Sequence, residues 1–476
     1  MKTYKLYLNG CWAEPSEPID VVNPATGEPF ARIGTVRREG VRQALVDADR
    51  ASSGWRSLTA LQRGDFLRAI AQGIESRGEE FARAITVENG KPLPQSRAEV
   101  AMTRDHLRWF AEEGRRVYGR IVPHQRDGKR HMVLRVPVGV VGAISPWNFP
   151  LMLSVRKVAP ALAAGCPVLL KPASATPIAC AMLAEVVDAV GLPPGVFQLL
   201  LGSAREIAAE MLENPLCRKI SFTGSTQVGQ ELIRGSAQNV TKLSLELGGH
   251  APVLVFDDAD IDRAVEGAAA AKYRNTGQSC IAANRIYVHR SIYDRFLEAL
   301  VEHSRKLSLG PGLEEGVEIG PLINQSALDE AMRHIEQAVA DGARVLCGGK
   351  RWPGAAGYFL EPTVLADVPD DALCMTQETF APIAPVTAFE DERQAIERAN
   401  ATRYGLAAYA FTNDLSRVWR LAEVLEAGTI GINDGVPTTS TCPFGGLKQS
   451  GIGRELGVEG IDAFLETKHI SMGVEA

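Results

Sequence analysis

The sequence predicts an α/β protein built around doubly wound, mostly parallel sheets. Between residues 136 and 247, short apolar segments alternate with amphipathic helical segments, and a second alternation runs from 251 to about 430. Apolar strands of this length are typical of parallel sheets that are covered by helices on both faces. A chain of 476 residues is also long enough for two or three domains with large cores.

The first alternation supplies five expected strands, which are 136–144, 166–172, 196–201, 219–222 and 243–247. Helices separate them. One helix is expected to have Thr176 as its N-cap, Pro177 at its first position and Gly191 just past its end. The next helix is expected to run through Met211, and another is expected to begin near Thr226.

The second alternation opens with the strand APVLVF at 251–256 and continues with a helix near 261–274, the strand RIYVHR and a helix near 291–307. The boundary between the two parts is expected at Gly248-Gly249, which could act as a hinge. The C-terminal segment ETKHISMGV is expected to form one short strand. Such a strand needs a partner, and another subunit is one source of it.

Composition excludes several classes of function. The net charge is −6, with 51 basic and 57 acidic residues, so no basic field is present to attract nucleic acid or an anionic membrane. The N-terminus lacks an apolar signal-peptide core, and the longest apolar run is too short to span a bilayer, so we expect a cytoplasmic protein. The eight cysteines form no CxxC or CxxH pair, so neither a metal site nor a disulfide framework is expected.

Cys280 stands in the segment RNTGQSCI and is the first candidate for chemistry. An ordinary thiol is only slightly ionised at neutral pH, so a nucleophilic cysteine needs a base or a favourable dipole nearby. Glu246 ends an apolar strand and is followed by two glycines. Partial burial would raise its pKa and make it a candidate base. The alternatives are a structural cysteine and a solvated glutamate at a strand end.

Other polar residues follow strand ends, where open α/β sheets bind ligands. Asn148 in PWNFP could donate to an oxyanion or could simply form a turn. Lys171 in KPAS could contact a nucleotide. FTGSTQVG at 222–229 is a strand–glycine–helix turn suited to a pyrophosphate, although its spacing is not GxGxxG.

Taken together, these segments resemble the aldehyde dehydrogenase superfamily over nearly the whole chain. The motifs occur in the family's order: PWNFP, KPAS, FTGST, LELGG, GQSC, QETF at 377–380 and PFGGLKQSGIGRE at 443–455. The interval between Glu246 and Cys280 also fits. The resemblance implies that Cys280 attacks the aldehyde carbonyl, that Asn148 and the Cys280 backbone N–H hold the oxyanion, and that Glu246 activates water to release the acid.

The resemblance also implies a fold and a cofactor site. A Rossmann-like dinucleotide-binding domain would comprise residues 1–117 and 138–248, and a catalytic domain would comprise residues 249–447. Residues 118–137 and 448–476 would form a small β flap that helps to assemble a homodimer or homotetramer. Glu378 and Phe380 would position the nicotinamide end of the cofactor. The other expected cofactor-binding residues are Ile144, Pro146, Trp147, Lys171, Ser174, Gly224, Ser225, Val228 and Leu247.

Two residues depart from the family pattern. His250 stands where asparagine or lysine is usual, and Ala381 stands where glycine is usual. Ser174 replaces a glutamate that is frequent in NAD-preferring relatives and would repel a 2′-phosphate. Because serine removes this repulsion and Lys171 adds positive charge, NADP is expected to be preferred, with NAD also possible.

Within the superfamily, the succinate-semialdehyde dehydrogenases are the most similar group, on segments such as LELGGHAPVLVFDDADIDRAVEGA. In that group two arginines bind the substrate carboxylate, and Arg156 and Arg274 match them. A hydroxyl from Thr438, Thr439 or Ser440 would be the third anchor, with Thr439 preferred. The expected substrate is therefore a short anionic aldehyde, first succinate semialdehyde. Glutarate semialdehyde, a sulfonated aldehyde such as sulfolactaldehyde, and broad specificity are the alternatives.

Three competing hypotheses concern the reaction itself. An acylating dehydrogenase would pass the thioester to coenzyme A, but Glu246 favours hydrolysis. A catalytically silent, structural family member would not be expected to retain Asn148, Glu246, Cys280 and Glu378 together. A zinc or Tyr-x-x-x-Lys alcohol dehydrogenase lacks the necessary residues here. Ala282 occupies the position where some relatives carry a second, redox-active cysteine, so no internal disulfide switch is expected.

Overall fold

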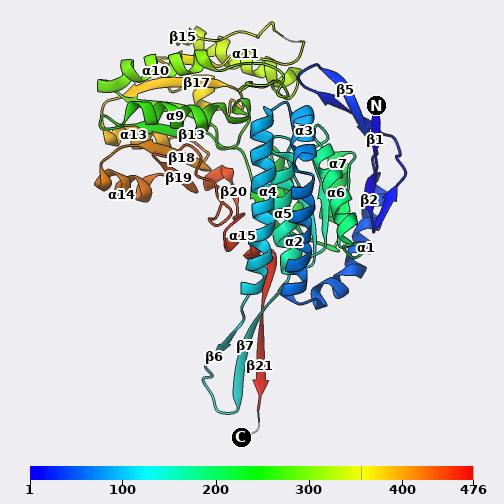
Figure 1. Ribbon diagram of the computed structural model, residues 1–476. Helices are drawn as coiled ribbons and strands as arrows, with labels where there is room; N and C mark the ends of the chain where they lie inside the picture. The colour runs from blue at the N-terminus through cyan, green and yellow to red at the C-terminus, as the bar shows by residue number, and fades with distance from the viewer. Residues whose placement is uncertain (355, 475–476) are drawn as a thin grey trace.

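The computed structural model describes residues 1–354 and 356–474, and its core is formed by two large sheets (Figure 1). The first sheet has the strand order β10-β9-β8-β11-β12-β20. All its neighbouring strands are parallel except β20, which is antiparallel to β12. Its strands are β8 (Val140–Ile144), β9 (Val168–Lys171), β10 (Phe197–Leu199), β11 (Cys217–Thr223), β12 (Lys242–Glu246) and β20 (Gly451–Ile452).

Helices cover both faces of this sheet. Successive residues of a strand point to opposite sides, so each strand packs against both helix layers. In β8, Val141 and Ala143 belong to the core shared with helices α2 (Ala60–Ser76), α3 (Gly78–Asn89), α4 (Leu93–Glu113), α5 (Pro150–Ala164) and α6 (Ile178–Val190). Val140 and Ile144 pack instead with α1 (Arg38–Ser57), α7 (Ala204–Glu213) and α8 (Thr226–Ser236). The predicted doubly wound architecture is confirmed.

The second sheet has the order β15-β16-β17-β14-β13-β18-β19, and only β15 is antiparallel to its neighbour. Its strands are β13 (Ala251–Val255), β14 (Ala283–His289), β15 (Arg344–Cys347), β16 (Thr363–Ala366), β17 (Ile383–Phe389), β18 (Ala407–Phe411) and β19 (Thr429–Ile432). Its helices are α9 (Ile261–Tyr273), α10 (Tyr293–Lys306), α11 (Gln325–Ala340), α12 (Leu373–Thr376), α13 (Glu392–Asn400) and α14 (Leu415–Val424). None of the described helices has both the length and the apolar composition needed to cross a membrane.

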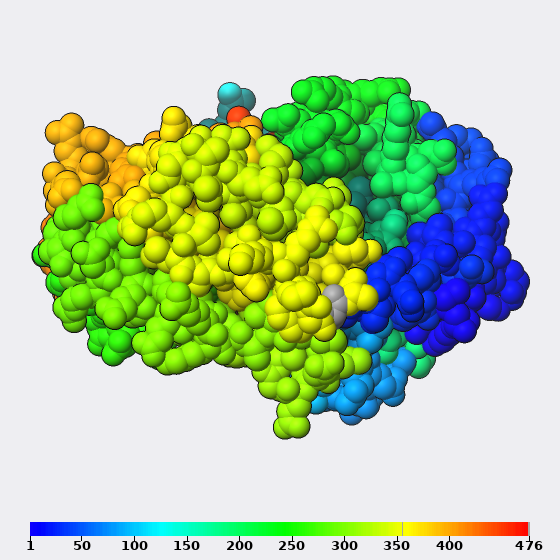
Figure 2. All heavy atoms as spheres, turned by 90° about the horizontal axis from the view of Figure 1, so that it is seen from above, coloured from blue at the N-terminus to red at the C-terminus, as the bar shows by residue number. Residues whose placement is uncertain are grey.

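The N-terminal strands lie on the outside of the molecule. A sheet of β1 (Lys2–Tyr4), β4 (Ile19–Asn23) and β5 (Glu28–Ile33) and a hairpin of β2 (Leu6–Leu8) and β3 (Cys11–Ala13) precede α1. Seen from above, these blue residues lie against yellow residues of the second part of the chain (Figure 2). The Tyr358 N–H donates to the Pro24 oxygen at 3.1 Å. The N-terminal segment therefore tethers the two parts of the chain.

A three-stranded flap that includes β21, the last described strand, projects from the body (Figure 1). It consists of β6 (Arg120–Val122), β7 (Lys129–Pro137) and β21 (Leu465–Gly473). The C-terminal strand finds its partner in β7 of the same chain. The flap segment expected at 448–476 is also too broad, because β20 belongs to the first sheet and α15 (Glu459–Asp462) precedes β21.

Two expected elements are corrected by the structure. The apolar run 136–144 is not one strand: β7 ends at Pro137 and β8 begins at Val140, with Gly139 between them at φ +121°. Helix α6 begins at Ile178, so Thr176 is not its N-cap. The Glu88 carboxylate instead accepts from the N–H groups of Ile178 and Ala179, at 2.6 and 3.0 Å. A tertiary contact therefore replaces the local cap. The predicted end is confirmed, since Gly191 closes the helix at φ +75°.

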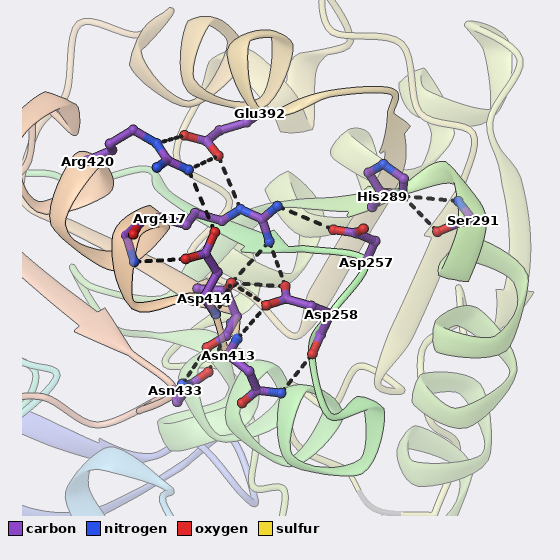
Figure 3. A network of polar contacts seen from close by, with 12 residues as sticks. Asp257, Asp258, His289, Ser291, Glu392, Asn413, Asp414, Arg417, Arg420 and Asn433 are labelled. Atoms are coloured by element: carbon purple, nitrogen blue, oxygen red, sulfur yellow. Dashed lines mark hydrogen bonds and ion pairs between the residues drawn. The ribbon is translucent and has the colours of Figure 1, made fainter.

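A polar network ties together the loops at one end of the second sheet (Figure 3). Asp258 accepts from the Thr412 hydroxyl at 2.9 Å, from the Asn413 N–H at 2.8 Å and from Arg417 at 2.6 Å. Arg417 and Arg420 both pair with Glu392. The network joins β13 and β18 to α13 and α14 and involves none of the candidate site residues, so its role is to stabilise the second sheet.

Candidate active site

The segment that carries Cys280 follows α9 and has an unusual backbone. Asn275, Thr276 and Gly277 have φ values of 51°, 58° and 75°. A left-handed conformation is rare for a β-branched residue such as Thr276, so the surrounding contacts must impose it. The Thr276 hydroxyl donates to the Gly320 oxygen at 3.1 Å and accepts from the Gly320 N–H at 3.2 Å.

Tight packing explains why glycine precedes the cysteine in this segment. A Cβ on Gly277 would lie 2.2 Å from the main-chain oxygen of Ala381. Gln278 holds the next turn, because its side chain donates to the Asn275 oxygen at 3.1 Å and accepts from the Ile323 N–H at 2.8 Å. Contacts with segments distant in sequence, at Gly320, Ile323 and Ala381, therefore hold the backbone that presents Cys280 at the interface between the two sheets.

Asn148 lies between β8 and α5 and reaches the cysteine loop from the first sheet. Its Nδ2 donates to the Gln278 oxygen at 3.2 Å, whereas its Oδ1 is buried without a hydrogen-bond partner among the described residues. Lys91 Nζ donates to the Asn148 main-chain oxygen at 2.6 Å and to Glu99 at 2.7 Å. A buried ion pair thus holds the turn, and the second N–H of the amide remains available to a ligand.

Glu246 ends β12 and is buried, and neither of its carboxylate oxygens has a hydrogen-bond partner among the described residues. Burial, followed by the charge of Glu455, raises its pKa to about 7. Glu378 is partly buried, and desolvation raises its pKa to about 8 although its Oε1 accepts from the Gly249 N–H at 3.2 Å. The expected rise in the pKa of Glu246 is confirmed.

Burial and the charges of Glu246 and then Glu378 raise the pKa of the Cys280 thiol well above its usual value, while Arg156 opposes the rise. The thiol is therefore protonated at neutral pH in this structure. A group with a pKa near 7 beside it, Glu246, can accept its proton when an electrophile arrives.

A cleft leads from Cys280 toward the ends of the strands of the first sheet. Its lining includes seven of the expected cofactor-binding residues, and Asn148, Thr223, Gly248 and Cys280 line it as well. The seven are Pro146, Trp147, Gly224, Ser225, Leu247, Glu378 and Phe380. Trp147 and Phe380 meet edge to face, with ring centroids 5.5 Å apart. Apolar walls with a few polar groups suit a flat heterocycle next to the thiol.

The other four expected cofactor-binding residues do not line that cleft. Ile144 and Lys171 end the neighbouring strands β8 and β9, and Ser174 follows β9. Lys171 is buried, and burial lowers its pKa to about 8. Val228 is exposed in the first turn of α8, and its N–H donates to the Ser225 hydroxyl at 3.3 Å. These residues lie along the sheet edge on which a dinucleotide would extend from the cleft.

Arg156 and Arg274, the two arginines expected to bind the substrate, lie near enough to Cys280 for electrostatic effects: Arg156 opposes the rise in the thiol pKa, and the charges of Arg156 and Cys280 both act on Arg274. Arg156 is only 3% exposed, which excludes an outward-facing position on α5, and its guanidinium lies 4.8 Å from the centre of the Phe444 ring. The Arg274 guanidinium lies 5.0 Å from the centre of the Phe149 ring. Burial and the nearby charge of Arg156 lower the pKa of Arg274. Neither arginine forms an ion pair with a carboxylate in the described parts of the chain.

The hydroxyl groups of the loop before β20 have different surroundings. The Thr439 hydroxyl lies 3.3 Å from that of the exposed Thr441. Ser440 is buried, and its Oγ lies 2.8 Å from His106 Nδ1. The Thr438 hydroxyl is buried without a partner among the described residues. Thr438 is therefore the residue of this loop with an unused buried donor.

Some residues near the site were not identified from the sequence. Lys157 is buried, donates to the Thr223 hydroxyl at 2.6 Å and pairs with Glu455. These residues carry no local motif for this contact, because they come from α5, β11 and the segment after β20, which only the fold brings together. Lys157 lowers and Glu455 raises the pKa of Glu246, so the pair tunes the candidate base.

The two departures from the family pattern are both buried. His250 has two ring nitrogens without hydrogen-bond partners among the described residues, and burial keeps its pKa well below the usual value. Its main-chain oxygen accepts from Arg285 at 3.0 Å. The main chain of Ala381 packs against Gly277.

The aldehyde dehydrogenase family profile matches residues 12–470 of this chain. The chain belongs to the aldehyde dehydrogenase family. Similar curated proteins include the succinate-semialdehyde dehydrogenase [NADP(+)] GabD of Escherichia coli K12, at 47% identity over 98% of this chain and 97% of the relative. A glutarate-semialdehyde dehydrogenase of Pseudomonas aeruginosa PAO1 is also 47% identical, with the same coverage. A 3-sulfolactaldehyde dehydrogenase of Pseudomonas putida is 44% identical over 98% of this chain and 96% of its own.

Solved structures have the same fold as this chain. A crystal structure of an Escherichia coli NADP-dependent enzyme superposes on this aldehyde dehydrogenase with a TM-score of 0.98, at 46% identity, covering 99% of this chain and 98% of that one. A betaine aldehyde dehydrogenase from Staphylococcus aureus in complex with NAD⁺ gives a TM-score of 0.97 at 36% identity, covering 99% and 95%. This aldehyde dehydrogenase therefore has the aldehyde dehydrogenase fold and is an NAD(P)-dependent enzyme that oxidises an aldehyde. An alcohol dehydrogenase is excluded.

Proposed function

We propose that Cys280 is the nucleophile, Asn148 the oxyanion donor and Glu246 the general base. The Cys280 sulfur adds to the aldehyde carbon as its proton passes to Glu246, and the carbonyl oxygen becomes an oxyanion near the Asn148 amide and the Cys280 N–H. Glu246 then releases this proton to solvent. NAD(P), when bound, supplies the hydride acceptor. Loss of hydride leaves a thioester on Cys280, which Glu246 hydrolyses by taking a proton from water. Water rather than coenzyme A is the acyl acceptor, because Glu246 is present.

The cofactor site agrees with these roles. The apolar edge-to-face pair of Trp147 and Phe380 leaves a flat cleft beside Cys280. Ser225 caps α8, whose free N-terminal N–H groups suit a phosphate. We propose that NADP is preferred over NAD, because Ser174 places no carboxylate beside the ribose and Lys171 contributes a positive charge.

The substrate is proposed to be a short aldehyde with an anionic group at its far end. The observation that carries this proposal is the pair of guanidinium groups near the thiol, Arg156 buried and Arg274 partly buried, without a carboxylate partner in the described residues. Uncompensated buried charge is costly. A carboxylate or sulfonate on the substrate would relieve that cost and would orient the aldehyde toward Cys280.

Succinate semialdehyde is the first candidate, and glutarate semialdehyde and sulfolactaldehyde are the others. Relatives named for all three substrates have nearly the same identity to this chain, so overall similarity does not separate them. The hydroxyl of the 438–440 loop is the third anchor in this proposal. Thr439 was the sequence-based choice, and the unpartnered hydroxyl of Thr438 makes it the competing choice.

The β flap is proposed to assemble a homodimer or homotetramer. In the described chain β21 is an edge strand, since only β7 pairs with it. An open edge of this length is normally covered or paired.

Kinetics on an aldehyde panel test the substrate proposal. Purified enzyme with NADP or NAD would be given succinate semialdehyde, glutarate semialdehyde, sulfolactaldehyde and neutral butyraldehyde, with and without coenzyme A. We expect an anionic aldehyde to exceed butyraldehyde in kcat/KM by about 100-fold, and Arg156→Met and Arg274→Met each to reduce that ratio about tenfold or more. Arg290→Met, a surface control that pairs with Glu390, should leave the ratio unchanged. Equal rates with butyraldehyde would refute the proposal.

A further inference from the structure

A chain of three polar side chains holds the Arg156 guanidinium from behind. Arg156 Nε donates to His106 Nε2 at 3.2 Å. His106 Nδ1 lies 2.8 Å from the Ser440 hydroxyl, which donates to Asp105. His106 is 0% exposed and Ser440 1% exposed, whereas Asp105 is at the surface of α4. The chain therefore runs from a buried cation to solvent.

The direction of these hydrogen bonds follows from chemistry. A guanidinium can only donate, so His106 Nε2 must be an acceptor and the imidazole proton must be on Nδ1. That N–H then donates to Ser440, which leaves the serine hydroxyl proton for Asp105. Burial and the charge of Arg156 keep the pKa of His106 well below its usual value, so the ring remains neutral. Each donor in the chain has one acceptor.

We infer that His106, supported by Ser440 and Asp105, is a positioning residue that fixes the Arg156 guanidinium for the anionic end of the substrate. The bond to Nε leaves the two terminal nitrogens of Arg156 without a hydrogen-bond partner in the described chain, apart from a contact of 4.0 Å between Nη2 and the Met152 sulfur. The Phe444 ring supports one face of the guanidinium. The side chain is therefore oriented before substrate arrives, which reduces the entropy lost on binding. This inference rests on the proposed anionic substrate.

Substitutions of His106 separate this role from a structural one. His106→Gln keeps an amide oxygen that can reach Arg156 Nε, whereas His106→Asn is shorter and can reach only Ser440. We expect His106→Asn to lower, about tenfold, the ratio of kcat/KM for the best anionic aldehyde to kcat/KM for butyraldehyde. The change should be in KM, and its size corresponds to the loss of one hydrogen bond to a charged group. His106→Gln should recover most of the ratio, and Ser440→Ala should have a smaller effect than His106→Asn. His289→Asn, at a partly exposed histidine that contacts Ser291 far from Arg156, is the matched control.

Crystal structures of the wild type and His106→Asn provide a readout that does not depend on substrate. The expected result is an Arg156 guanidinium that is displaced or adopts several conformations in the variant. Any of three results would overturn the inference. The first is an equal loss of the kcat/KM ratio in His106→Asn and His106→Gln, the second is a fall in kcat with both aldehydes, and the third is an Arg156 guanidinium that keeps its position in His106→Asn. If the wild type itself shows no preference for anionic aldehydes, the proposed substrate class fails, and the crystal structures still decide whether His106 holds Arg156.

Discussion

Gly249 lies so close to Cys280 that a Cβ on it would stand 2.1 Å from the Cys280 main-chain oxygen. The same residue donates its N–H to Glu378. Gly248-Gly249 was interpreted from the sequence as a hinge, but this packing gives the second glycine a different role. It lets the end of the first sheet contact the cysteine loop directly.

Gly249→Ala should therefore abolish most of the activity, because the new methyl group must push the Cys280 loop away from Glu246 and Asn148. A displacement of about 1 Å can cost on the order of 100-fold in rate. Steady-state kinetics with saturating NADP measure the loss. Gly54→Ala is the matched control, since a Cβ there meets nothing within 4 Å and the residue lies in α1. Retained activity in Gly249→Ala would show that the loop tolerates the shift.

The hydrolytic step should depend on the ionisation of Glu246. A general base acts in its ionised form, and its pKa is about 7. Turnover should therefore rise as pH increases through 7. Glu246→Gln should slow turnover about 10²- to 10⁴-fold and should also shrink the burst of reduced cofactor, because Glu246 accepts the Cys280 proton before hydride transfer. Stopped-flow absorbance measures both phases, with the exposed Glu423→Gln as control. A full burst followed by slow turnover would mean that Glu246 acts in hydrolysis alone and that another group accepts the thiol proton.

Free enzyme should resist alkylation at Cys280 at neutral pH. The thiolate is the reactive form, and burial with two nearby carboxylates raises the pKa of this thiol well above its usual value. Iodoacetamide at pH 7 should modify the exposed Cys11 and Cys442 first, and the labelling of Cys280 should increase with pH. Peptide mass spectrometry over a time course gives the order. Rapid labelling of Cys280 at pH 7 would show that the thiolate already exists without substrate.

Two isosteric substitutions can decide which threonine hydroxyl of the 438–440 loop binds the anionic group of the substrate. Thr438→Val removes a buried hydroxyl that has no protein partner in the described residues, whereas Thr439→Val removes one that contacts only Thr441. If Thr438 binds the substrate, its variant should raise KM for the anionic aldehyde about 10-fold, the value of one charge-assisted bond, while Thr439→Val changes KM less than about twofold. The opposite pattern would return the role to Thr439.

Cofactor preference should respond to both Ser174 and pH. Ser174→Glu should shift the ratio of kcat/KM for NADP and NAD toward NAD, because the carboxylate repels a 2′-phosphate. Lys171 has a pKa of about 8 and is charged below it. The wild-type preference for NADP should therefore decline as pH rises through 8. An unchanged cofactor ratio in Ser174→Glu would remove the basis for the predicted NADP preference.

The sequence alone determined the fold class, most element positions and the candidate chemical residues. The apolar run 251–256 was predicted as a buried strand and contains β13, the run 136–144 was predicted as one strand and contains β8, and Gly191 marked a helix end correctly. Cys280, Glu246 and Asn148 could be selected because each stands in a short motif at a strand or helix end. These are local properties, and the periodicity of apolar residues and short sequence motifs indicate them directly.

The tertiary structure decided everything that depends on residues distant in sequence. Glu88 rather than Thr176 caps α6, and β7 rather than a neighbouring subunit supplies the first partner of β21. Lys157 and Glu455 tune Glu246, and His106 meets Arg156, only because the fold packs together segments that are remote along the chain. A pKa and a hydrogen bond depend on burial and on neighbours in space. A motif records which side chain is present, and only the packed chain determines its surroundings.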